Sequence, residues 1–202
     1  MKKFLASLAT IGLCASCGGT SAVTFEEVRQ EFVRLDDQFD NFEPTPDTEL
    51  PQSGSTTYQG AALAVVLNSS GGPNSTEFLA VGRSRVTANF DSGTLSSVSN
   101  NFFEITNVPS DLSAPRLNDD PEGEAIAGEV RISLRQTIPG ANSFEGGSSG
   151  SLSSLSGAII DFDISSSANG LLGGENGEAA TLATARGDRG IVTGMVVVAD
   201  KP

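Results

Sequence analysis

The stretch EFLAVGRSRVTANFDSGTLSSVSNNFFEI, residues 77–105, decides the fold. Its central part alternates: Gly82, Ser84, Val86, Ala88 and Phe90 fall on one side, and Arg83, Arg85, Thr87 and Asn89 on the other. This period of two predicts a strand with one buried face, because successive side chains of a strand point to opposite sides. The following Asp91-Ser92-Gly93 predicts a turn, since glycine accepts a positive φ. Residues 94–105 should then return as a second strand, with Phe90 opposite Thr94 or Leu95.

The same pattern recurs along the rest of the chain. Strands are expected at residues 55–67, 77–90, 94–105, 124–136, 143–155, 157–165, 178–186 and 190–199. Sequential antiparallel strands of this number close into a barrel or split into a sandwich. Small inward residues mixed with Val, Ile and Phe favour the filled interior of a barrel. Outward charges such as Arg131 and Asp161 exclude a lipid-facing band. The predicted fold is therefore all-β, an eight-stranded antiparallel up-and-down soluble barrel at residues 55–199.

One amphipathic helix is predicted before the barrel, at residues 24–42. Thr24 and Glu27 have the spacing of a capping box, in which each side chain bonds the other's backbone N–H. Apolar residues then recur at spacings of three and four, at Phe25, Val28, Phe32, Leu35 and Phe39. We expect this stripe to lie against the barrel or to close one end, and the alternative is a partner-binding helix. Residues 43–54, with three prolines, predict a stiff extended connector.

The N-terminus predicts export and lipid anchoring. Residues 1–16 combine Lys2 and Lys3 with an apolar run too short to span a bilayer, as in a signal peptide. Small residues before Cys17 resemble the lipobox of bacterial lipoproteins, which implies fatty acyl chains such as palmitate on Cys17 and a tether at residues 17–23. Gly18 in place of aspartate favours the outer membrane. The alternative is an ordinary signal peptide. Cleavage would leave Cys17 alone, which excludes an internal disulfide.

Composition excludes several classes of function. The formal net charge of −13 argues against nucleic acid and anionic lipid as partners. The sequence has no histidine, which removes histidine-bound haem or zinc and the usual catalytic base. Residues 146–150, GGSSG, match the Gly-x-Ser-x-Gly of hydrolases but are interpreted as a hairpin loop. Asp161 and Asp163 share one side of a strand at a spacing of about 7 Å, and we interpret them as solvated carboxylates.

The longest irregular segment, residues 106–123, is the candidate binding site. Its end is acidic, with Asp119, Asp120 and Glu122 followed by Glu124. A loop of this length in a compact barrel is typically functional, and its charge suits a basic partner or a weakly held calcium. The alternative is a solvated loop with no binding role.

Three stretches resemble a known family. They are LPQSGSTTYQG at residues 50–60, VTANFDSGTL at 86–95, and NGLLGGENGEAA at 169–180, followed by Gly194. The order of these three motifs is similar to that in a family, the β-barrel domain of transferrin-binding protein B. This family includes small alphaproteobacterial lipoproteins that carry a single barrel. The resemblance covers roughly residues 50–199. Leu171 and Leu172 replace its aromatic pair, Asn89 replaces an aspartate, and Thr181 stands where glycine is common. The two-lobed receptors of this family bind transferrin through loops of their N-terminal lobe, so transferrin binding cannot be transferred to this chain residue by residue.

Residues and resemblance together predict a non-enzymatic binding lipoprotein anchored in the outer membrane. Its barrel loops would engage a protein or a small solute, with no cofactor and no metal. The alternative is a structural envelope lipoprotein without a dedicated ligand. The resemblance implies the cell surface, whereas the short tether leaves the periplasmic face open, since the six residues 18–23 that follow Cys17 reach at most roughly 20 Å. The protein is expected to be a monomer.

Overall fold

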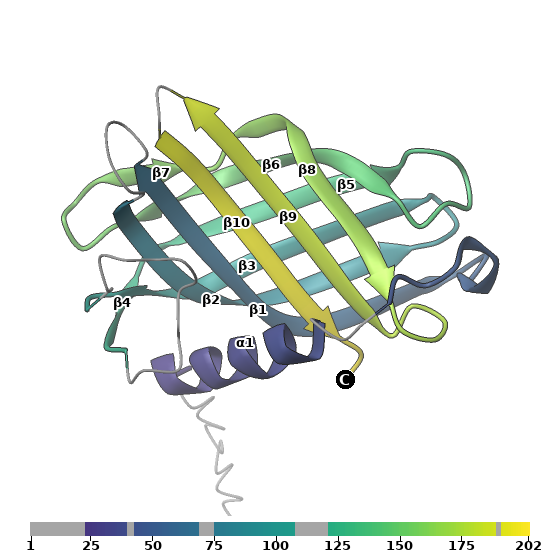
Figure 1. Ribbon diagram of the computed structural model, residues 1–202, viewed down its shortest axis with the longest axis horizontal. Helices are drawn as coiled ribbons and strands as arrows, with labels where there is room; N and C mark the ends of the chain where they lie inside the picture. The colour runs from purple at the N-terminus through teal and green to yellow at the C-terminus, as the bar shows by residue number, and fades with distance from the viewer. Residues whose placement is uncertain (1–22, 40–42, 69–74, 108–120, 189–190) are drawn as a thin grey trace, which may run out of the picture.

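The computed structural model (Figure 1) describes residues 23–39, 43–68, 75–107, 121–188 and 191–202. These residues form the helix α1 (Phe25–Phe39), the short 3-10 helix η1 (Asp47–Glu49) and ten strands. The strands are β1 (Ser55–Asn68), β2 (Ser75–Asn89), β3 (Thr94–Ile105), β4 (Gly123–Ile126), β5 (Gly128–Gln136), β6 (Phe144–Ser153), β7 (Ile159–Asp161), β8 (Ile164–Gly173), β9 (Ala179–Asp188) and β10 (Ile191–Asp200).

Eight of these strands close into an antiparallel barrel. The order around the wall is β1, β2, β3, β5, β6, β8, β9 and β10, and β10 pairs with β1 to complete the ring. Strands that follow one another in the sequence are therefore neighbours in the wall. The predicted eight-stranded up-and-down barrel is confirmed. Closure gives every strand of the wall a partner on both sides, which removes the exposed edges of an open sheet.

The short strands β4 and β7 are parts of interrupted barrel strands. β4 pairs with residues 102–105 of β3 and β5 pairs with residues 94–99, so residues 123–136 are one strand broken at Ala127. β7 and β8 share β6 in the same way, with the break at residues 162–163. The strand predicted at 157–165 is therefore too short, because β8 continues to Gly173. Its serines and glycines hide the alternation, since they supply few apolar side chains.

The opening hairpin has the predicted faces. Val86 and Ala88 are buried inside the barrel, whereas Arg83 and Arg85 are exposed outside it. The register pairs Asn89 with Thr94 and Ala88 with Leu95. Phe90 therefore faces neither Thr94 nor Leu95, because it belongs to the turn at residues 90–93.

Side chains fill the barrel interior. The buried cluster combines large residues, among them Tyr58, Leu95, Phe102, Phe144, Phe162, Leu172 and Met195, with small ones such as Ala62, Ala64 and Ala180. At Gly82 an added Cβ would lie 2.6 Å from the Phe102 ring, so the missing side chain makes room for that ring. This packing follows the mixture of small and large inward residues expected of an eight-stranded barrel.

The helix lies against the outer wall beside β1 and β2 (Figure 1). The predicted capping box is present: Thr24 N donates to Glu27 Oε2 at 3.1 Å, and Glu27 N donates to Thr24 Oγ1 at 3.3 Å. The apolar stripe packs on outward residues of four strands, with Val28, Phe32 and Leu35 buried against Ala61, Leu79, Val81, Ile105 and Val198. Residues 40–42 of the predicted helix lie outside the described residues. The helix therefore covers apolar outer wall and does not close an end of the barrel.

Candidate functional site

The filled interior directs the search for a site to the two ends of the barrel. End A carries the turns at residues 90–93, 137–143 and 174–178 together with the segment 43–54. End B carries the turn at 154–158 and the described residues 106–107 and 121–122, which flank β3 and β4. Residues 69–74, 108–120 and 189–190 lie outside the described residues.

The segment 43–54 folds over end A and is part of the barrel's closure. Pro44 forms a β-bridge with Gly173, and Thr45 N donates to Leu172 O at 3.0 Å. Thr45 and Leu50 are 2% and 4% exposed, and Leu50 belongs to the interior cluster. The prediction of an extended connector is therefore incomplete: residues 47–49 form η1, and the backbone at Pro44 and Thr45 pairs with β8.

Asn142, in the β5–β6 turn, holds this closure in place. Its Nδ2 donates to Thr45 O at 2.8 Å and to Leu172 O at 2.6 Å, and its Oδ1 accepts from Leu172 N at 2.7 Å. Its backbone N donates to Asp47 Oδ1 at 2.7 Å. One side chain thus bonds both the connector and the end of β8. Sequence reasoning missed Asn142, because an asparagine in a turn is ordinary and its partners are far away in the chain.

Tyr58 closes end A from the inside. Its side chain is fully buried, and its hydroxyl donates to Gly177 O in the β8–β9 turn at 2.9 Å. Burial raises the pKa of the Tyr58 phenol to about 12, because the phenolate would lose its hydration in the barrel. Tyr58 is thus a structural side chain rather than a ligand for a bound group.

Tyr58 is expected to give the protein an alkaline instability. The folded protein holds the phenol proton to about pH 12, whereas an unfolded chain releases it near pH 10. The free energy of unfolding should therefore fall between these two pH values, by about 2–3 kcal/mol in total. Below about pH 10, Tyr58 should contribute nothing to the dependence of this free energy on pH. Phenolate absorbance measures the titration directly, because Tyr58 is the only tyrosine and there is no tryptophan. Titration near pH 10 while the barrel is still folded would contradict the assignment, and Tyr58→Phe should remove the loss.

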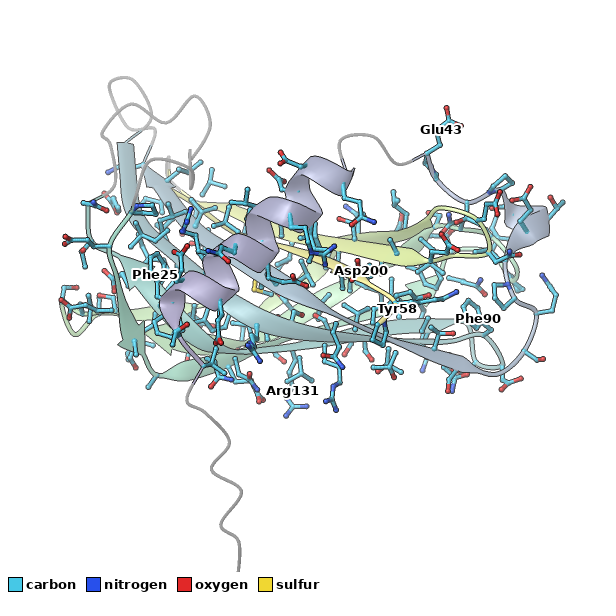
Figure 2. All side chains as sticks on the ribbon, turned by 90° about the horizontal axis from the view of Figure 1, so that it is seen from below. Phe25, Glu43, Tyr58, Phe90, Arg131 and Asp200 are labelled. Carbon is cyan, nitrogen blue, oxygen red and sulfur yellow. The ribbon has the colours of Figure 1, made fainter. Side chains whose placement is uncertain are left out.

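A hollow of about 520 Å³ lies on the rim of end A. The connector, the β2–β3 turn and the β5–β6 turn line it, through Leu50, Pro51, Gln52, Phe90, Asp91, Ser92, Gly93, Arg135, Gln136, Pro139 and Gly140. We call it the rim hollow. Figure 2 shows Phe90 at the same end of the barrel as Tyr58. The half-buried Phe90 side chain packs on the interior cluster and gives the hollow an apolar side.

Most polar groups of the rim hollow are already engaged by the fold. Asp91 Oδ2 accepts from Gly54 N at 3.1 Å, and Gln136 Nε2 donates to Ala141 O at 3.0 Å. Arg135 is exposed and has no ion pair within the part of the chain that the structure describes. The hollow therefore offers one available guanidinium beside an aromatic ring, a combination suited to a carboxylate on an apolar body.

The β5–β6 turn adds an exposed apolar tip beside the rim hollow. Ile138 is 67% exposed, and the neighbouring Pro139 lines the hollow. An isolated apolar side chain at a surface is common. Ile138 therefore only adds exposed apolar area next in the chain to Pro139.

At end B the structure describes part of the predicted acidic site. Glu122 and Glu124 are exposed, and Glu124 pairs across the strands with Glu104. Glu104 Oε2 already accepts from Leu155 N at 2.6 Å. Asp119 and Asp120 lie outside the described residues. Within the part of the chain that the structure describes, no group of three or more His, Cys, Asp or Glu side chains is placed to hold a metal ion.

The two hydrolase-like motifs have structural roles. Residues 146–150 lie inside β6, so their interpretation as a hairpin loop is wrong: the glycines let neighbouring strands approach closely. Ser148 is buried and donates to Phe162 O at 2.6 Å. Asp163 Oδ1 accepts from Gly150 N, and Asp161 Oδ1 accepts from Asp163 N, which caps the break between β7 and β8. These carboxylates therefore stabilise an interrupted strand.

Cys17, the predicted lipidation site, lies outside the described residues. No helix among the described residues is both long enough and apolar enough to span a bilayer.

No protein-family model and no curated protein matches this chain. Similar solved structures include two crystal structures of the vaccine antigen transferrin binding protein B from Haemophilus parasuis, a double mutant and a single mutant. Each is 16% identical to this chain with a TM-score of 0.45, and the match covers 78% of this chain and 28% of that one. The chain thus spans less than a third of the length of these structures.

Proposed function

We propose that this protein is a non-enzymatic binding lipoprotein, anchored in the outer membrane through acylated Cys17, that engages its partner at the rim hollow of end A. The observation that carries the proposal is the filled barrel. Because side chains occupy the interior, a ligand cannot enter the barrel, and at its end the rim hollow brings Phe90 and Arg135 together.

The partner proposed is a protein that presents a carboxylate next to an apolar side chain. Arg135 would pair with the carboxylate, while Phe90 and Ile138 would contact the apolar part. Aromatic and arginine side chains commonly supply most of the energy of such an interface. The Asn142 bonds tie two of the three walls of the hollow to each other and to β8. Walls that are already held together lower the ordering cost of binding.

Site-specific photo-crosslinking in cells tests the proposed function. A photo-reactive phenylalanine in place of Ile138, at end A, should give a discrete adduct. The same residue in place of Ile159, which is 65% exposed in β7, is the matched control and should give none. Arg135→Gln or Phe90→Ala should each weaken capture by about tenfold, as removal of a central arginine or aromatic side chain does.

Two results would overturn the proposed site. Equal adducts from positions 138 and 159 would show contact without selectivity. An adduct that persists in both Arg135→Gln and Phe90→Ala, together with an envelope defect on deletion of the protein, would favour the structural envelope role instead. The cell-surface location, rather than the periplasmic face, is part of the proposal, and it requires the adduct to form with a reagent or partner outside intact cells.

A further inference from the structure

The outer wall of β2, β3 and β5 carries a group of arginines. Arg83, Arg85, Arg131 and Arg135 all point outward and are exposed. The register places Arg85 opposite Val98 and Val98 opposite Arg131, so these two arginines share a row across three strands. Among the outward positions at 83–89, 94–100 and 129–135, Glu129 is the one carboxylate. We call this surface the arginine face. It is positively charged on a chain whose net charge is −13.

A second hollow, of about 450 Å³, opens on the arginine face. Its lining consists of Gln59, Arg83, Ser84, Arg85, Val98 and Asn100, with no carboxylate. A register shift between β2 and β3 lies beside it: Val81 pairs with Phe103 but Arg83 pairs with Asn100, which leaves one extra residue on β3. The hollow therefore gathers hydrogen-bond donors from guanidinium and amide groups, the set that suits a phosphate.

The ion pairs of the arginine face leave it available to an anion. Arg83 lies 3.5 Å from Glu27 and Arg131 lies 2.7 Å from Glu129, with at least 41% of each side chain exposed. Exposed pairs of this kind are weak and exchange readily with other anions. Arg85 has no ion pair within the described residues.

The arginine face adjoins the point where the described chain begins. Glu27, the partner of Arg83, also bonds the backbone of Thr24. Cys17 precedes Val23 by six residues, which reach at most roughly 20 Å when extended. Figure 2 shows Arg131 pointing away from the barrel at its lower edge, whereas α1 lies across the side turned to the viewer. A membrane against the arginine face would therefore contact Glu27, the partner of Arg83, but would not have to contact the other acidic residues of the helix.

We propose that the arginine face docks on the phosphates of anionic lipid headgroups in the membrane that holds the Cys17 acyl anchor, with the second hollow taking one headgroup phosphate. This proposal rests on the lipid anchor of the proposed function. Guanidinium groups match phosphate geometry through paired N–H donors. The net charge, which argues against anionic lipid for the whole chain, averages over an acidic helix and end B. It does not describe this side of the barrel.

Labelling of membrane-anchored protein tests the docking. The protein is purified from cells that process it and reconstituted in vesicles of phosphatidylcholine, alone or mixed with phosphatidylglycerol. Ser133→Cys, exposed between Arg131 and Arg135, reports on the arginine face, and Ala183→Cys, exposed on β9, reports on another side. Reaction with a polymer-linked maleimide should slow at position 133 when phosphatidylglycerol is present, and not at position 183. High salt should restore the rate by screening the charges.

Charge variants show whether the arginines cause the protection. Arg85→Gln should lower the ratio of docked to free protein, obtained from the protection at position 133, by about fivefold. This is the effect expected of one arginine near an anionic surface. Arg186→Gln makes the same charge change on β9 and should leave the ratio unchanged.

Three results would overturn the docking proposal. They are an equal rate at position 133 in both vesicles, equal protection at positions 133 and 183, and protection in native membranes but not in phosphatidylglycerol vesicles. The last would indicate an acidic protein on this face. Flotation with phosphatidylcholine vesicles tests the acyl anchor separately, because an unacylated chain would not float with them.

Discussion

Phe102→Ala is expected to lower the free energy of unfolding by about 3–5 kcal/mol, the range for removing a large aromatic side chain from a core. The Phe102 side chain is 1% exposed and packs over Gly82, which has no side chain to move into the vacated space. The cavity would therefore persist in a barrel whose wall is closed on all sides. Denaturant unfolding measures the change, with an unaltered dependence on denaturant as the sign that the native barrel is retained.

A double-mutant cycle separates this packing from a general loss of apolar area. Gly82→Ala alone should also destabilise, because its Cβ would lie 2.6 Å from the Phe102 ring. When Gly82→Ala is combined with Phe102→Ala, the added methyl group enters the cavity. The double mutant should therefore lose about 1 kcal/mol less stability than the sum of the losses in the two single mutants. Phe103→Ala is the matched control, since this half-buried ring lies on the outer wall beside Phe25. Additive effects for Gly82 and Phe102 would refute the contact.

Asn142→Ala is expected to cost about 3 kcal/mol, from three side-chain hydrogen bonds worth about 1 kcal/mol each. Its loss leaves Leu172 N without a partner, while Thr45 O and Leu172 O lose a donor at a largely buried position. The connector should then separate from β8. Hydrogen exchange should show faster exchange at the amides of Thr45 and Leu172, with interior amides of β1 less affected.

The control for Asn142 is Asn169→Ala, at an exposed outward position of β8. A surface change of this kind should stay within about 0.5 kcal/mol. If Asn142→Ala behaves like Asn169→Ala, the closure of end A does not depend on this side chain. Asn142 would then not be the residue that holds the walls of the rim hollow together.

Part of the candidate site could be anticipated from the sequence. The turn at Asp91-Ser92-Gly93 and the outward position of Arg135 follow from alternation, and both belong to the rim hollow. The hollow itself could not be anticipated, because Pro51, Phe90 and Pro139 come from three segments whose approach depends on barrel closure. The binding role of the acidic segment at Asp119 and Asp120 stays a prediction. The neighbouring Glu104, which the structure describes, accepts a hydrogen bond from Leu155 N.

The sequence by itself determined the faces of the strands and the start of the helix. Alternation assigns each side chain of β2 to one side, and Thr24 with Glu27 caps α1 through contacts three residues apart, so both are local properties. Only the tertiary structure decided that Asn142 bonds Thr45, 97 residues away, and that Arg85 and Arg131 share a row through Val98. These contacts depend on strand order and register, and a slip of one residue would turn every side chain to the other face. Closure of the barrel sets that register, and closure is a property of all eight strands together.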